Sequence, residues 1–328
     1  MQSTIIRSGR VSHFGRQKKA FGWCLASSIM LLCITALGQE TIQGKLNDVI
    51  RIDTGLVVVR ATVVDKKGHA VVGLKKPDFR LVEDNVEQTI ALFSSDPSPV
   101  SWGLVLDRSG SMEGMMTDVS RAALHVIDNG TTDDEMFILS FNETTDLLTP
   151  FERDRHRLEN AIAGLRADGN TAVYDAVNFA LEQFKGAKYR KKVLIVITDG
   201  EDNASKVKLR SLIERAEEDE VIIYSVGMVG TGYMAMRSRS GFRDELEKLA
   251  SVTGGSAHFP DSIKECQRVM SVISLEVKDQ YSLAYYPSNN SYDGRWRSIK
   301  VTRVPDTPRD HLIRTRKGYY AKAKNANH

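Results

Sequence analysis

From about residue 100 onward, apolar runs alternate with stretches in which apolar residues recur every three or four positions. Apolar runs are typical of buried strands, and the recurring pattern is typical of amphipathic helices. The run KVLIVIT at 192–198 is apolar almost throughout, which indicates a strand covered on both faces. In 172–184 the apolar residues fall on one helical face. Strict alternation of this kind predicts an α/β fold with a doubly wound, mostly parallel sheet.

The pattern gives each element of this region approximate bounds. Strands are expected at 102–106, 136–141, 147–151, 192–198, 221–226 and 257–259. Helices are expected at 115–127, 157–165, 172–184, 209–218, 244–251 and 263–277.

Both flanks of the α/β region have β character. Short strands are predicted at 55–64, 79–83, 88–93, 280–286, 298–303 and 313–320. Because these strands lie on either side of one domain, we hypothesise that the two flanks pair with each other. The expected division is a leader at 1–38, a lead-in and small β unit at 39–97, the α/β domain at 98–275, a C-terminal β extension at 276–322 packed with 50–95, and a tail at 323–328.

The leader has the composition of a targeting segment. Residues 1–38 contain five basic residues and no acidic one, and the stretch 21–37 carries no charge. A basic start, an apolar centre and a small-residue end are typical of a secretory signal peptide. An uncleaved N-terminal anchor is the alternative, since 17 residues is the lower limit for spanning a bilayer. The chain is therefore expected to be exported to the periplasm, the cell envelope or the extracellular space.

Charge argues against nucleic-acid binding, and cysteine content argues against a disulfide-stabilised or zinc–thiolate protein. The net charge of +3 falls to −2 without the five basic residues of the leader, so no basic stripe for nucleic acid is expected. Two of the three cysteines lie in the leader, which leaves Cys266 alone. The chain beyond the leader therefore has neither an internal disulfide nor a zinc–thiolate site.

The segment DRSGS at 107–111 directly follows the strand predicted at 102–106. Ligands of open α/β sheets bind beyond the carboxyl ends of the strands, and Asp107 falls at such an end. Ser109 and Ser111 lie in the turn that enters the next helix. A carboxylate and two hydroxyls offer hard oxygen, which suits Mg²⁺, Ca²⁺ or Mn²⁺ and not zinc or copper.

Two further segments are expected at the same edge. The strand 192–198 runs into Asp199, and the polar loop 168–171 ends in Thr171 just before a helix. We call the complete predicted set the metal-site cluster: Asp107, Ser109, Ser111, Thr171 and Asp199.

The D-x-S-x-S run at 107–111, Thr171 in a glycine-containing loop and Asp199 in a T-D-G turn together resemble the metal-ion-dependent adhesion site of von Willebrand factor type A domains. The resemblance covers about residues 98–275 and includes the strand–helix alternation. The flanks resemble the bacterial exported subgroup labelled VWFA-related, in which a short β segment precedes the domain and a segment like YSLAYYP…DGRWRSIKV…RKGYY follows it.

The resemblance implies a role for each member of the metal-site cluster. The Ser109 and Ser111 hydroxyls would bind the ion directly, and Thr171 would bind directly in the ligand-bound state. Asp107 and Asp199 would act largely through waters. The ion, most commonly Mg²⁺ with Ca²⁺ and Mn²⁺ as alternatives, would keep an open position for a Glu or Asp of a partner protein. The resemblance thus implies a binding or adhesion module and no enzyme, with no catalytic residue.

Other interpretations remain for single residues. Serine is a common residue at helix N-caps, so Ser109 and Ser111 could simply cap the next helix. Asp-Gly is a common turn sequence, so Asp199 before Gly200 could simply form a turn. Asp175 and Asp202 are candidates for a supporting shell around the cluster. The run GTGYMA at 230–235 matches G-x-G-x-x-A, but the following MRSRSG does not open an apolar helix, which argues against a dinucleotide site.

Two other functions compete with the binding module. One is a structural envelope protein in which the ion only stabilises the domain. The other is a metal-dependent hydrolase with Asp107 as nucleophile. Phosphotransfer sites of that type usually have a second carboxylate two residues on, and Ser109 occupies that position.

Overall fold

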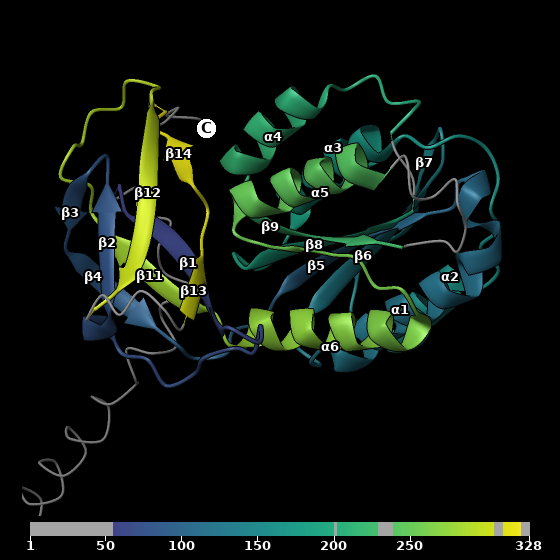
Figure 1. Ribbon diagram of the computed structural model, residues 1–328, viewed down its shortest axis with the longest axis horizontal. Helices are drawn as coiled ribbons and strands as arrows, with labels where there is room; N and C mark the ends of the chain where they lie inside the picture. The colour runs from purple at the N-terminus through teal and green to yellow at the C-terminus, as the bar shows by residue number, and fades with distance from the viewer. Residues whose placement is uncertain (1–54, 200–201, 229–238, 305–310, 323–328) are drawn as a thin grey trace, which may run out of the picture. The chain divides into compact units, whose positions relative to one another are not determined.

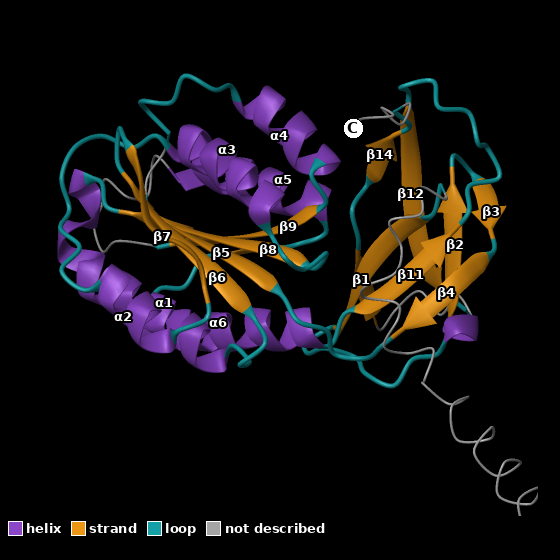
Figure 2. Cartoon of the chain, turned by 180° about the vertical axis from the view of Figure 1, so that it is seen from behind, coloured by secondary structure: helices purple, strands orange, loops and turns teal. Residues whose placement is uncertain are grey.

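The computed structural model describes residues 55–199, 202–228, 239–304 and 311–322. They form an α/β domain and two small antiparallel sheets (Figures 1 and 2). The predicted leader, the GTGYMA run and the C-terminal tail lie outside the described residues. Among the described helices, none combines the length and the hydropathy that crossing a bilayer requires.

The central sheet has six strands in the order β10-β9-β8-β5-β6-β7. They are β5 (Ser101–Asp107), β6 (Glu135–Phe141), β7 (Thr145–Glu152), β8 (Lys192–Thr198), β9 (Val221–Gly227) and β10 (Ala257–His258). All neighbours are parallel except β7, which runs antiparallel to β6. The predicted doubly wound, mostly parallel sheet is confirmed.

Helices cover both faces of this sheet, as the alternation along β5 requires. Leu104 packs in the core beneath one face, whereas Val105 packs beneath the other. The first face carries α1 (Met116–Asn129), α2 (Arg155–Ile162) and α6 (Ile263–Lys278). The second carries α3 (Val173–Gln183), α4 (Leu209–Glu218) and α5 (Arg239–Thr253). Helix α5 begins five residues before its predicted start at 244.

The flanking strands form two four-stranded antiparallel sheets in the orders β13-β1-β11-β4 and β14-β12-β2-β3. Their strands are β1 (Val57–Asp65), β2 (Phe79–Glu83), β3 (Val86–Gln88), β4 (Ile90–Ser94), β11 (Tyr281–Tyr285), β12 (Trp296–Arg303), β13 (His311–Arg314) and β14 (Gly318–Tyr320). Strand β1 pairs with β11 and β13, so segments from before and after the α/β domain share one sheet. A common apolar core joins the two sheets.

The single strand predicted at 313–320 is wrong, because the chain passes from one sheet to the other within it. Strand β13 pairs with β1, and β14 pairs with β12 of the second sheet. Gly318 permits this crossing: a Cβ there would lie 2.2 Å from the Arg297 carbonyl oxygen and 2.5 Å from the Trp296 ring. The strand-like composition of the segment gives no sign of the change of partner.

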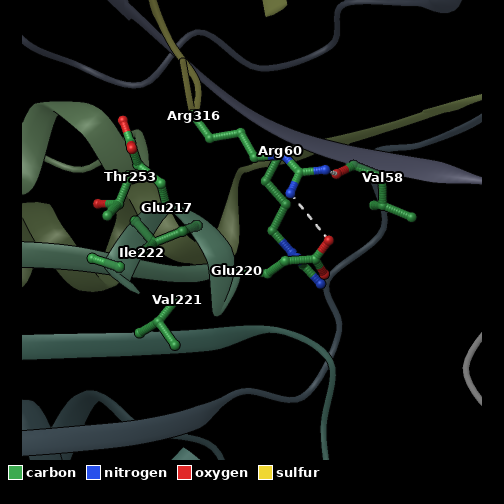
Figure 3. Close-up of a pocket in the computed structure, with 9 residues that line it drawn as sticks. Val58, Arg60, Glu217, Glu220, Val221, Ile222, Thr253 and Arg316 are labelled. Atoms are coloured by element: carbon green, nitrogen blue, oxygen red, sulfur yellow. Dashed lines mark hydrogen bonds and ion pairs between the residues drawn. The ribbon is translucent and has the colours of Figure 1, made fainter. Parts of the chain in front are cut away.

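A set of charged contacts links the β extension to the α/β domain. Arg316 donates to the Glu220 carboxylate at 3.0 Å and to the Val58 carbonyl oxygen at 2.8 Å, as Figure 3 shows. Arg314 and Glu276 form a second ion pair, with a nitrogen–oxygen distance of 2.5 Å and a Glu276 side chain that is 3% exposed. Removal of one partner of the buried Arg314–Glu276 pair would leave the other as an uncompensated buried charge, which is costly.

Lys191, just before β8, is a buried cation in the same region. It is 5% exposed, and its ammonium donates to the Val277 carbonyl oxygen at the end of α6. The pKa of Lys191 is lowered to about 7, chiefly by burial and also by the nearby charge of Arg60, whereas Asp134 and Asp279 oppose the shift. The folded protein therefore releases a proton here that the unfolded chain keeps.

The free energy of unfolding should accordingly depend on pH through Lys191. The folded-state pKa of about 7 lies below the ordinary value of 10.5, so the unfolded state binds the extra proton between these limits. Stability should rise with pH across that window, by at most about 1.4 kcal/mol per pH unit. Urea unfolding of wild type and Lys191→Met at pH 7, 8 and 9 measures the contribution.

Lys191→Met should show a smaller rise than wild type. Lys248→Met, which changes an exposed lysine, should keep the wild-type slope. Equal slopes in wild type and Lys191→Met would contradict the assigned proton release.

Candidate metal centre

Asp107 is the last residue of β5, the strand between β6 and β8. Its side chain is fully buried. The Ser109 N–H donates to its Oδ1 at 2.7 Å, and the Thr198 hydroxyl donates to its Oδ2 at 2.5 Å. One carboxylate thus fixes the turn after β5 and the carboxyl end of β8, at the point where the strand order reverses.

Ser109, Ser111 and Asp199 lie together beside this carboxylate. The Ser109 and Ser111 hydroxyl oxygens are 3.2 Å apart, and the Ser111 hydroxyl donates to Asp199 Oδ1 at 2.8 Å. Ser109 is buried and Ser111 is exposed, so the group extends from the end of the sheet to the surface. The structure brings these four members of the metal-site cluster into one hydrogen-bonded group.

Thr171 lies in a loop that contacts the same turn through its backbone. The Gly110 N–H donates to the Gly169 carbonyl oxygen at 2.9 Å. The Thr171 N–H donates to Asn203 Oδ1 at 3.0 Å, and the Thr171 carbonyl oxygen accepts from the Asn203 N–H at 2.9 Å. The Thr171 side chain is buried. Its loop is therefore held between the turn after β5 and the segment after β8.

Asp175 and Asp202 brace the loop that follows β8. Asp175 Oδ1 accepts from the Val207 N–H at 2.8 Å, and both of its oxygens accept from the Lys206 N–H. Asp202 Oδ1 accepts from the Ser205 hydroxyl at 2.5 Å and from the Tyr174 N–H at 3.3 Å. These hydrogen bonds fasten the loop after β8 to the first turn of α3, and they occupy both carboxylates.

The two carboxylates of the cluster are costly to ionise together. Burial raises the pKa of Asp107, against hydrogen bonds from Thr198 and Ser109 that lower it. Burial also raises the pKa of Asp199 to about 6; the Ser111 hydroxyl opposes this shift, and the negative charge of Asp107 adds to it. No cationic side chain contributes to either shift within the described part of the chain.

This arrangement fits a hard divalent cation. All five members of the metal-site cluster offer oxygen, from two carboxylates and three hydroxyls. Nowhere in the described residues do three His, Cys, Asp or Glu side chains gather as a conventional metal site, so a centre here depends on hydroxyl oxygens. Arg108, the nearest cation in sequence, pairs instead with Asp146 and Asp168 at 2.8 and 2.7 Å.

Three residues that position the cluster were missed at the sequence level. Thr198 holds Asp107, and Arg108 holds Asp168. The Asn142 amide donates to the Asp168 side chain at 2.9 Å, and the Asn142 carbonyl oxygen accepts from the Ala172 N–H. Asn142 directly follows β6, a parallel neighbour of β5, and this place at a strand end was the available signal.

Comparison with known proteins decides the family. The sequence profile of the von Willebrand factor type A domain matches residues 103–271. The chain belongs to this family. The match spans β5 to α6, and so includes every residue of the metal-site cluster.

A curated relative shows moderate sequence similarity to part of the chain. The uncharacterized protein sll0103 of Synechocystis sp. is 27% identical over 176 residues, which are 51% of this chain and 39% of that protein. This chain thus matches about two fifths of its curated relative's length.

Two solved structures are similar to parts of the chain. A von Willebrand factor type A protein from Catenulispora acidiphila has 13% identity and a TM-score of 0.49, over 79% of this chain and 71% of that one. The conserved hypothetical protein BatB from Bacteroides thetaiotaomicron has 18% identity and a TM-score of 0.44, over 55% and 99%.

Gly169 provides a test of how the Thr171 loop is held. Its φ is +76°, and a Cβ would lie 2.1 Å from Glu143 Oε2, the oxygen that accepts from the Asn170 N–H. Gly169→Ala should lower the free energy of unfolding by about 1–2 kcal/mol, because an L side chain is strained at this φ. It should also weaken the binding of added Mn²⁺, because relief of the contact with Glu143 and Asn142 shifts the loop that leads to Thr171.

Gly164→Ala is the matched control, with a φ of +80° and no atom within 4 Å of the added Cβ. Urea unfolding and calorimetric Mn²⁺ titration of both variants separate the two effects. The expected result is a similar loss of stability in both and a loss of affinity in Gly169→Ala alone. Equal Mn²⁺ affinity in both variants would show that the loop takes no part in the site.

Proposed function

We propose that the chain is an exported protein-binding module in which a divalent cation, held by the metal-site cluster, captures an acidic residue of a partner protein. One observation carries the proposal. Two carboxylates, Asp107 and Asp199, are linked through Ser109 and Ser111 at the carboxyl end of the sheet, and no described cation pairs with either. An added cation would compensate both charges.

The burial of the cluster supports different roles for its members. Both oxygens of Asp107 already accept hydrogen bonds from Ser109 and Thr198, so this carboxylate acts from behind the hydroxyls. Ser111 is exposed, which makes its hydroxyl the natural inner ligand, together with that of Ser109. Thr171 would complete the set from its own loop. Mg²⁺ suits such a site, because it retains waters and accepts a carboxylate oxygen in their place.

We assign no reaction to the site. A nucleophilic Asp107 would be expected to have a partner carboxylate at position 109, which is a serine, and its two oxygens are occupied by hydrogen bonds. A bound cation with an open coordination position can instead capture an acidic side chain of a partner, and this needs no catalytic residue. The basic and apolar leader supports export, with the cell envelope, the periplasm or the extracellular space as the location.

Thermal unfolding tests the cation. In chelator and then with excess Mg²⁺, Ca²⁺ or Mn²⁺, the wild-type midpoint should rise, by an amount equivalent to about 2.7 kcal/mol when the ion is at 100 times its dissociation constant. Ser111→Ala should lose most of the rise, because it removes the exposed hydroxyl that joins Ser109 to Asp199. Ser251→Ala, an exposed serine of α5, should respond as wild type does. A folded wild-type protein with no response to any of the ions would refute the site.

Partner capture has a separate test. On arrays of Asp- or Glu-containing peptides with Asn or Gln counterparts, binding should need both the carboxylate and Mg²⁺. Asp107→Ala should abolish it while the fold persists, at a cost of about 1–3 kcal/mol for the donors left unsatisfied. An ion that raises the midpoint in a protein that captures no acidic peptide would favour the structural alternative, in which the ion only stabilises the domain.

A further inference from the structure

A second candidate site lies on the β extension, where tyrosines line a cavity of about 420 Å³. The wall comes from the loop after β11, from β14 and from the chain that enters β1. We name it the tyrosine pocket after Tyr286, Tyr292, Tyr319 and Tyr320. None of these four residues belongs to the family match at 103–271.

Two of the tyrosines are largely exposed and take no part in the packed core of the small sheets. Tyr286 is 56% exposed and Tyr292 is 49% exposed. Tyrosine covers a large apolar area with a rigid ring and keeps a polar end, so exposed tyrosines around a cavity are typical of recognition surfaces. The core of the two small sheets is complete without Tyr286 and Tyr292, which are absent from its cluster of packed residues.

The pocket is held in shape before any ligand arrives. Ser288 and Gln88 exchange two hydrogen bonds of 2.9 Å. Arg297, which is 5% exposed, donates to the Ser291 carbonyl oxygen at 3.2 Å and to Asp293 at 2.9 Å. The loop that carries Tyr292 is thus fixed at both ends, and a preorganised wall lowers the entropic cost of binding.

The inner wall is equally constrained. The Tyr319 hydroxyl donates to the buried Glu83 carboxylate at 2.9 Å. The Tyr320 ring packs edge-on against Trp296, with ring centroids 5.0 Å apart. Gly55 leaves space for Tyr292, because a Cβ there would lie 2.7 Å from the Tyr292 hydroxyl.

The charged side chains of the pocket are already paired within the protein. Arg316 binds Glu220 at 3.0 Å, and Lys322 binds Glu218 at 2.6 Å. An anionic ligand would have to compete with Glu220 and Glu218 for these guanidinium and ammonium groups, which reduces what it gains by binding here. The pocket therefore favours an uncharged ligand.

The polar groups that remain are amides and hydroxyls. Asn289, Asn290 and Ser291 are consecutive and exposed along one wall, where Asn289 Oδ1 accepts from the Ser291 N–H at 3.1 Å and still has its amide donors. Amide and hydroxyl side chains each offer a donor and an acceptor. Sugar hydroxyls need both, and the C–H faces of a pyranose ring pack flat on aromatic rings. A proline-rich peptide offers carbonyl acceptors but few donors, so it would leave the acceptors of this wall unused.

We propose that the tyrosine pocket binds a neutral oligosaccharide, stacked on Tyr286 and Tyr292 and hydrogen-bonded by the Asn289–Ser291 wall. A cavity of about 420 Å³ lies within the usual range of small-ligand sites. The site is independent of the metal-site cluster, so its binding does not require a divalent cation.

The test is calorimetric titration of the purified full chain with chitotetraose, cellotetraose, maltotetraose and mannotetraose in chelator. At least one should bind, and Tyr286→Ala and Tyr292→Ala should each weaken its binding roughly tenfold or more, since each removes a stacking ring. Asn290→Ala should weaken it through lost hydrogen bonds. Phe179→Ala, which removes a 39% exposed aromatic ring of α3, should bind as wild type does.

Several outcomes would overturn the proposal. They are binding by none of the four sugars, binding that Tyr286→Ala and Tyr292→Ala leave unchanged in folded protein, and binding of a proline-rich peptide in place of a sugar. A preference for a sulfated sugar over its neutral parent would contradict the uncharged character assigned to the pocket. Circular dichroism of each variant confirms that the fold is retained. Titration of Asp107→Ala in parallel distinguishes this site from the metal-site cluster, because sugar binding should persist there.

Discussion

The buried carboxylate of Asp107 is the constraint on which the rest of the edge depends. It ends the central strand of the sheet and accepts from the Ser109 N–H and the Thr198 hydroxyl. Those two bonds fix the turn after β5 against the end of β8. The positions of Ser111 and Asp199 follow, because the Ser111 hydroxyl can then reach Asp199 at 2.8 Å. The same negative charge is costly to bury, since burial raises the pKa of both carboxylates.

Much of the α/β domain could be predicted from the chain because its signals are local. The apolar run at 192–198 became β8 with the predicted bounds, since only a strand covered on both faces accommodates so continuous a run. The place of Asp107, Ser109 and Asp199 at one edge follows from their positions after parallel strands. The contacts of the Thr171 loop were harder to predict. Asn142 has the same signal, a place directly after a parallel strand, but its bond to Asp168 and the bond of Asn203 to Thr171 depend on how three separate segments meet.

The β extension was harder to predict because its partners are distant in sequence. Strand β1 pairs with β11, more than 200 residues later, and no local pattern specifies such a register. The division of 313–320 into β13 and β14 depends on the close packing of Gly318 against Arg297, which composition cannot reveal. The tyrosine pocket has the same origin. Tyr292 lies over Gly55 only because the two flanks of the domain fold together.

Membership of the von Willebrand factor type A family rests on residues 103–271, and the β extension adds a surface that the family match does not cover. The proposed cation site and the proposed neutral pocket lie on different parts of the chain, so a protein and a glycan could be bound at once, and two linked contacts hold more firmly than either alone.

Anomalous diffraction from crystals soaked in Mn²⁺ would locate the cation at this edge of the sheet. A strong anomalous peak is expected within coordination distance of the Ser109 and Ser111 hydroxyl oxygens, with Asp107 behind them. A peak at another place, or none at an ion concentration that raises the unfolding midpoint, would contradict the assignment of the cation to this edge of the sheet.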